Sequence, residues 1–169
     1  MAIINNVEIH WVKCDPSKPE RYQGKGPAKF SVQIRVKDKK QKESLEKEYG
    51  FKFSPMEDKD GKLVYKTSIS RYAYGSGPDG NEDTSKPNKP VNVILADGTP
   101  LDPNTVGNGS IANISFFTKE DKSGRTLKGI QVMKLMKFEP RADEDEFELT
   151  DNFEVIDSQG TKDNENDPY

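Results

Sequence analysis

The fold is decided by the stretch Phe30-Ser31-Val32-Gln33-Ile34-Arg35-Val36, which gives the clearest strand signal in the chain. Its apolar residues alternate strictly with polar ones, and successive side chains of a strand point to opposite faces of a sheet. One face of this strand is therefore expected to cover a core, while the other meets water. The polar face is basic, because Arg35 lies on it and Lys29 and Lys37 lie at its two ends.

Similar alternation on both sides of this stretch predicts further strands. Val7, Ile9 and Trp11 alternate with polar residues near the N-terminus, which predicts a strand with Trp11 in the core. Phe117, in a later β-rich segment, is also expected in the core, and the rings of Trp11 and Phe117 are kept as secondary candidates for base stacking. A short strand is expected over residues 91–95.

Two turn signals predict hairpins. Asp58-Lys59-Asp60-Gly61 separates the β-rich segments 51–56 and 62–74, and Asp121-Lys122-Ser123-Gly124 separates 110–119 and 126–138. Between the strands, residues 15–27 and 75–89 are rich in Gly, Pro and charged or polar residues and are expected to be exposed loops.

One helix is expected, over residues 38–49. Asp38 can cap its first turn, Gly50 can end it, and its apolar residues Leu45 and Tyr49 are four positions apart, which gives a narrow packing stripe. Strands joined by turns, with one helix and no β-α-β rhythm, predict a mainly β fold, an antiparallel barrel or sandwich.

Composition limits the size of the core. The chain has 169 residues, of which 31% are hydrophobic and 33% charged, and its mean hydropathy is −0.92. We expect one domain with a small core over residues 1–156, and an acidic tail over residues 157–169 that is disordered. Apolar residues within 147–156 are expected to dock on the domain as a last element.

Several functional classes are disfavoured by what the chain lacks. Cys14 is the only cysteine and His10 the only histidine, so neither an internal disulfide nor a zinc site is expected. The chain contains no nucleophile-elbow, phosphate-loop or zinc-protease motif. No apolar stretch is long enough to span a membrane, and the N-terminus does not resemble a signal peptide. We therefore expect a cytoplasmic protein without a cofactor, a metal or enzymatic activity.

Charge is distributed unevenly along the chain. Residues 139–169 contain 12 acidic and 2 basic residues, a net charge of −10, whereas residues 1–138 contain 17 acidic and 24 basic residues, a net charge of +7. A basic body with an acidic tail indicates that the body binds a polyanion and that the tail interacts with partners or with the body itself.

Basic and aromatic residues are interleaved in the segment 62–74. If its odd positions face the core, Lys66, Tyr72 and Tyr74 share the outer face. Cations that hold phosphates and rings that stack bases are what the binding of single-stranded nucleic acid requires. The candidate contact residues are the cations and tyrosines of this segment, of the loop 15–27 and of the predicted strands: Tyr22, Lys25, Arg35, Lys37, Lys66, Arg71, Tyr72, Tyr74, Lys119, Arg125, Lys128 and Lys134.

The chain resembles the single-stranded DNA-binding proteins of short-tailed phages. The likeness rests on the tail Asp163-Asn-Glu-Asn-Asp-Pro-Tyr169, on Val91-Asn-Val-Ile-Leu-Ala-Asp-Gly98 with Pro100-Leu-Asp-Pro103, on Gly107-Asn-Gly-Ser-Ile-Ala-Asn-Ile114, and on Gly129-Ile-Gln-Val-Met-Lys-Leu135. Bacterial proteins of this kind typically end in Asp-Ile-Pro-Phe, whereas this chain ends in Tyr169.

The resemblance implies an oligonucleotide-binding (OB) fold, a five-stranded antiparallel barrel with an extra hairpin here, and a DNA groove across it. It also implies a role in phage DNA replication, recombination or repair, in the cytoplasm of the infected bacterium. The tail would recruit a phage or host DNA polymerase and a primase-helicase through its last acidic residues and its aromatic end: Asp163, Glu165, Asp167, Pro168 and Tyr169. Because the tail and DNA are both anionic, they would compete for one groove.

Other functions remain open at this point. An RNA-binding OB or cold-shock-like module would show the same interleaving of cations and rings, but would use the 2′-hydroxyl of its ligand. A viral interaction protein could act through its acidic tail alone. A nuclease using the carboxylates of Asp143 and Asp145 is the most remote alternative. The sequence leaves a homodimer open.

Overall fold

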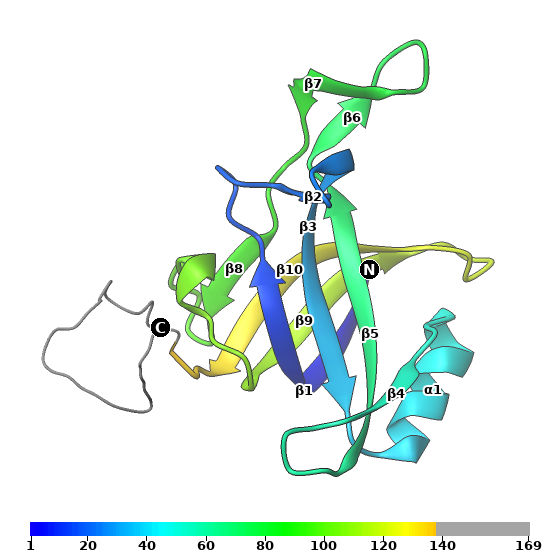
Figure 1. The fold of residues 1–169 in the computed structure, drawn as a ribbon, viewed down its shortest axis with the longest axis vertical. Helices are drawn as coiled ribbons and strands as arrows, with labels where there is room; N and C mark the ends of the chain where they lie inside the picture. The colour runs from blue at the N-terminus through cyan, green and yellow to red at the C-terminus, as the bar shows by residue number, and fades with distance from the viewer. Residues whose placement is uncertain (138–169) are drawn as a thin grey trace, which may run out of the picture. The chain divides into compact units, whose positions relative to one another are not determined.

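The computed structural model describes residues 1–137, and these form a mainly β structure (Figure 1). The predicted mainly β fold with one helix is confirmed. The elements in chain order are β1 (Ala2–Lys13), β2 (Glu20–Tyr22), β3 (Lys25–Val36), α1 (Lys39–Tyr49), β4 (Ser54–Glu57), β5 (Leu63–Tyr72), β6 (Tyr74–Ser76), β7 (Glu82–Pro87), β8 (Asn92–Leu95), the 3-10 turn η1 (Pro103–Thr105), β9 (Ser110–Thr118) and β10 (Arg125–Lys134).

Five long strands form a curled antiparallel sheet in the order β5-β3-β1-β9-β10. The curl brings β5 against β10, and a guanidinium nitrogen of Arg71 on β5 donates to the Leu127 carbonyl on β10 at 3.5 Å. The short strands extend this sheet: β4 pairs with β5, β2 with β3, and β8 runs parallel to β10. A five-stranded, partly open barrel of this kind is the architecture of the OB fold.

Alternation along the strands builds the core. On β3, Phe30, Val32, Ile34 and Val36 are buried, and on β9 the buried apolar residues include Ile114 and Phe116. The Phe116 ring contacts Tyr49 and Phe51 edge-on, with ring centroids 5.0 and 5.4 Å apart. These contacts attach α1 and the segment that follows it to one end of the barrel.

The helix has the predicted caps. The side chain of Asp38 accepts a hydrogen bond from the Lys40 backbone N–H at 2.9 Å, and Gly50 adopts a left-handed conformation with φ of 77°. A Cβ at position 50 would lie 2.4 Å from the Lys122 carbonyl oxygen, so glycine is required there for space as well as for conformation. Leu45 is buried and Tyr49 is packed against the core, as the stripe predicted.

Both predicted hairpins form, as β4–β5 and β9–β10, but residues 75–89 are not the loop that the sequence predicted. Strands β6 and β7 pair within this segment and make a separate two-stranded sheet at the end of the barrel away from α1 (Figure 1). Its residues are almost all polar, so the alternation that identifies half-buried strands is missing. Main-chain hydrogen bonds such as Gly77 N–H to Asn81 O, at 2.8 Å, hold its tip instead.

The inward face of β5 follows the prediction except at its start. Ile69 and Ala73 are buried and Tyr65 packs against the core, but Leu63 is 56% exposed. Leu63 is the first residue of the strand, and the next residue, Val64, is buried with 2% of its surface exposed, so the alternation is reversed at the start of β5.

Several predictions lie outside the described residues. They are the docking element over residues 147–156, the domain boundary at residue 156, the disorder of the tail, and the partner-binding residues Asp163, Glu165, Asp167, Pro168 and Tyr169.

Candidate nucleic-acid interface

The exposed side of β3 and β5 forms a continuous polar surface, because their residues lie in register. Four pairs of residues face each other on it: Lys29 with Tyr72, Ser31 with Ser70, Gln33 with Ser68, and Arg35 with Lys66. We call these eight residues the β3–β5 face. It combines cations at both ends, an exposed ring at one end and small hydroxyl side chains in the middle.

The small side chains make the middle of the β3–β5 face low. A hollow of about 590 Å³ lies over Ser31, Ser68 and Ser70, and its wall includes Lys25, Lys29 and one carboxylate, Glu20. A hollow of this kind has room for an extended chain, and its lysines can hold phosphates.

Tyr72 is the exposed ring of the β3–β5 face, with 55% of its surface accessible. The Lys29 ammonium lies 5.3 Å from the centroid of this ring, so a cation–π contact helps to hold it. Tyr74 is half-buried and packs against the core, and with Tyr72 it lines a second hollow of about 480 Å³. Of the two tyrosines, Tyr72 offers the more accessible surface for stacking.

The β6–β7 hairpin, which contributes to this second hollow, is attached to β3 by Glu82. One carboxylate oxygen of Glu82 accepts from the Ala28 backbone N–H at 2.9 Å, and the other from the Arg21 guanidinium at 2.7 Å. The pKa of Glu82 is held below its usual value, mainly by the hydrogen bond from the Ala28 N–H and then by the one from Arg21. The Glu82 carboxylate therefore helps to hold the hairpin against β3, next to Tyr72.

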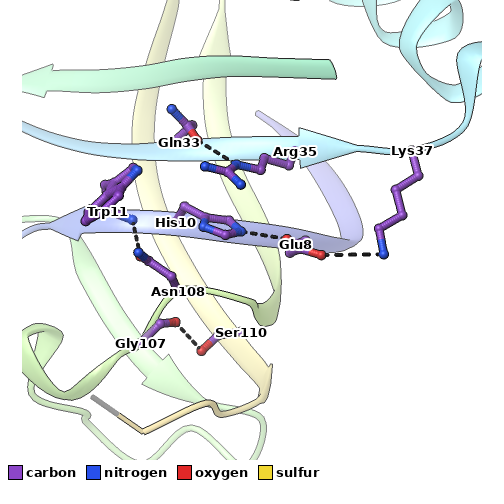
Figure 2. Close-up of polar contacts among 9 residues, drawn as sticks. All are labelled: Glu8, His10, Trp11, Gln33, Arg35, Lys37, Gly107, Asn108 and Ser110. Carbon is purple, nitrogen blue, oxygen red and sulfur yellow. Dashed lines mark hydrogen bonds and ion pairs between the residues drawn. The ribbon is translucent and has the colours of Figure 1, made fainter. Parts of the chain in front are cut away.

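Polar residues of β1 continue the surface beyond β3 (Figure 2). A carboxylate oxygen of Glu8 lies 2.6 Å from Nε2 of His10, and the other lies 3.9 Å from Nζ of Lys37. Arg35, the cross-strand partner of Glu8, donates from Nε to the Gln33 side-chain oxygen at 2.8 Å. Glu8 thus partly neutralises the basic surface beside Lys37.

The structure brings together only part of the predicted contact residues. Arg35, Lys66 and Tyr72 lie on the β3–β5 face, Lys25 and Tyr74 line the adjoining hollows, and Lys37 follows Arg35 at the end of β3. Tyr22 belongs to β2, which pairs with β3.

The remaining predicted residues lie elsewhere. Arg71 is paired with the buried Phe30 and is directed to the Leu127 carbonyl rather than outward. Arg125 donates to the Tyr49 carbonyl at 3.0 Å and lies 5.1 Å from the Phe51 ring centroid, so it braces the helix. Three lysines are exposed on the β9–β10 hairpin and are not part of the β3–β5 face: Lys119, Lys128 and Lys134.

Trp11 and Phe117 are not in the core, contrary to the prediction. Trp11 is 54% exposed and Phe117 is 46% exposed. Phe117 follows the buried Phe116 and simply lies on the opposite face of β9. Trp11 is turned outward by a bulge in β1 between His10 and Lys13, and Val12 packs against the core instead.

The bulge places Trp11 in a left-handed conformation, with φ of 53°. For a bulky residue such a conformation costs roughly 1–3 kcal/mol and persists only where surrounding contacts impose it. One such contact is the hydrogen bond from the Trp11 backbone N–H to the side-chain oxygen of Asn108, at 2.8 Å (Figure 2). Strict alternation could not have revealed this site, because a bulge reverses the faces after it.

The described residues offer little for other chemistry. No group of three or more His, Cys, Asp or Glu side chains in residues 1–137 is arranged to hold a metal ion. Burial raises the pKa of the Cys14 thiol to about 12, so it is not an activated nucleophile. Within the same residues, no helix has the length and apolar character needed to cross a membrane.

No protein-family model matches the sequence, and no curated protein does either. Among solved structures, the chain is similar to the single-stranded DNA-binding protein from bacteriophage Enc34 in complex with single-stranded DNA. That similarity has 16% sequence identity and a TM-score of 0.44, and covers 78% of this chain and 85% of that one. A C-terminal truncation of the same phage protein is similar at 17% identity and a TM-score of 0.42, over 78% of this chain and 84% of that one. These structures are of the kind of protein that the sequence resembles.

Proposed function

We propose that the protein binds single-stranded DNA without sequence preference and that the strand lies across the β3–β5 face. The observation that supports this most directly is the arrangement of that face, with Lys29, Arg35 and Lys66 around a row of serines and the exposed Tyr72 at one end. The outer face of the second and third barrel strands is also where OB folds bind oligonucleotides.

Each group on the face has a separate role in this proposal. The lysines and Arg35 bind phosphates, which requires charge but no base identity. Tyr72 stacks a base, and a stack is tolerant of sequence because every base has a π-face. Small serines let the backbone approach the sheet. No catalytic step and no cofactor is needed.

The acidic segment is proposed to regulate access and to recruit partners. Residues 139–169 carry a net charge of −10, so they can compete with DNA for the basic surface, and bound DNA would release them. The released end, with Asp167, Pro168 and Tyr169, would dock on a DNA polymerase or a primase-helicase with a basic rim and an apolar pocket. The setting would be phage replication, recombination or repair in the host cytoplasm.

Binding of labelled oligonucleotides across a salt series tests the proposal. The full chain is compared with a chain truncated after Ile156 and with a chain of unchanged length in which Asp163, Glu165 and Asp167 are replaced by their amides. We expect single strands to bind more tightly than duplex, and both altered chains to bind more tightly than the full chain, most strongly at low salt.

The outcomes separate the alternatives. If none of the three chains binds single strands, the basic face is only solvated surface and DNA binding is wrong. If matched RNA binds more tightly than DNA, the RNA-binding alternative replaces it. If single strands bind but the two altered chains behave like the full chain, the face is retained and the competing tail is rejected.

A further inference from the structure

Trp11 is held in an outward position that the core does not explain. Its indole is 54% exposed although it follows the buried Ile9 in an alternating strand. The bulge, the positive φ and the hydrogen bond to Asn108 together turn it away from the barrel interior. A strained backbone that exposes a large aromatic side chain is a feature typical of ligand-binding positions.

The surroundings of Trp11 form a small hollow of about 220 Å³. Its lining includes Trp11, Lys13, Asn104 and Asn108. Asn104 donates to the Asp15 carboxylate at 2.8 Å, which fixes the turn beside the hollow. A ring beside amide groups and a cation can stack a base and meet its polar edge or its phosphate.

The hollow continues the β3–β5 face. Strand β1 lies next to β3, with His10 opposite Gln33 and Lys13 opposite Ser31, so Trp11 is at the level of the middle of that face. Tyr72 is on β5, which pairs with the other edge of β3, and it lies opposite Lys29. From strand spacing and residue rise, the Trp11 and Tyr72 positions are about 14 Å apart, a distance that a few nucleotides can span.

We propose that Trp11, together with the segment 103–108, forms a second base-stacking subsite for single-stranded DNA. The strand would cross β5, β3 and β1 in turn, with one base on Tyr72 and a later one on Trp11. This inference rests on the proposed function, because it names where on the protein the same DNA continues.

The test uses the fact that Trp11 is the only tryptophan of the chain. An oligothymidine with a fluorescent label reports binding by anisotropy, while intrinsic tryptophan fluorescence reports stacking at this position alone. In the full-length protein we expect the tryptophan signal to be quenched in parallel with the rise in anisotropy. This measurement needs no substitution and therefore no assumption about folding of a variant.

Variants then measure the contribution of the ring. Trp11→Ala should weaken binding about 5- to 150-fold, which corresponds to one stacked base of roughly 1–3 kcal/mol. Trp11→Phe should retain most of the affinity. The matched control is Phe117→Ala, which removes an aromatic ring of similar exposure from β9 and should leave binding unchanged.

The results that reject this inference differ from those that reject the function. If anisotropy shows binding but the tryptophan signal does not change, or if Trp11→Ala binds as well as Phe117→Ala, the second subsite is wrong and DNA binding stands. If the full-length protein does not bind the oligonucleotide at all, both proposals are wrong.

Discussion

Replacing Lys66 with glutamine should stabilise the fold and weaken DNA binding at the same time. Lys66 lies directly opposite Arg35 in the sheet, and the ion pairs found among residues 1–137 include neither of them. Like charges directly opposite each other destabilise a sheet, by roughly 0.2–1 kcal/mol. Removing one of them should raise the free energy of unfolding by this amount.

The loss of binding can be estimated from the same residue. If Lys66 neutralises one phosphate, its removal should reduce the slope of log K against log salt by about 0.7. If the two proteins bind equally at 1 M salt, the variant then binds about five-fold more weakly than the unmodified protein at 0.1 M salt. Urea unfolding and oligonucleotide titration at several salt concentrations measure the two effects. The control is Lys59→Gln, which makes the same charge change in the exposed turn between β4 and β5. A destabilised Lys66→Gln protein, or one with an unchanged salt slope, would refute the reasoning.

Three further predictions concern the scaffold. Phe116→Ala should lower the free energy of unfolding by about 3–5 kcal/mol, because its ring is fully buried against Tyr49; a loss below about 1 kcal/mol in urea unfolding would contradict this packing. The pKa of Glu82 is lowered in the folded protein, so its contribution to stability is present above the pKa of an unfolded glutamate and is lost as pH falls through its pKa in the folded protein. Protease cleavage within residues 74–87 should therefore increase on acidification. In Glu82→Gln, cleavage should be fast and nearly independent of pH, and an acid response equal to that of the unmodified protein would exclude this role. Cys14 should react with thiol reagents only as fast as the protein opens, since burial raises its pKa to about 12; rapid labelling of the native protein would contradict its buried position.

Alternation predicted those parts of the fold where strands are regular and half-buried. The stretch Phe30–Val36 identified both the core side of β3 and its basic outer side, and the outer side became one half of the candidate interface. Capping residues located α1 because Asp38 and Gly50 act through local backbone geometry. The pairing of β3 with β5, which brings Arg35 beside Lys66, is a long-range contact that alternation alone does not specify.

The failures have physical causes of a different kind. Alternation predicts Trp11 in the core. The bulge adds one residue to the strand and so reverses the face to which the side chains point, and nothing in the local sequence marks it. The β6–β7 hairpin was missed because its backbone hydrogen bonds and the Glu82 contacts stabilise it without an apolar face. Arg71 is among the candidate contact residues because of its charge, yet its pairing with Phe30 places it on the inner side of the sheet.

Three departures from what stabilises a sheet lie on or beside the β3–β5 face. Arg35 and Lys66 put like charges opposite each other, Ser31 and Ser70 occupy positions where β-branched residues are favoured, and Trp11 has a left-handed backbone. Each of these departures opposes folding. A polyanion with flat bases would compensate all three, because it screens the cations, fills the space over the serines and covers the exposed indole. Natural sequences break such local rules mainly at functional sites, so this surface is the part of the molecule most consistent with selection for binding.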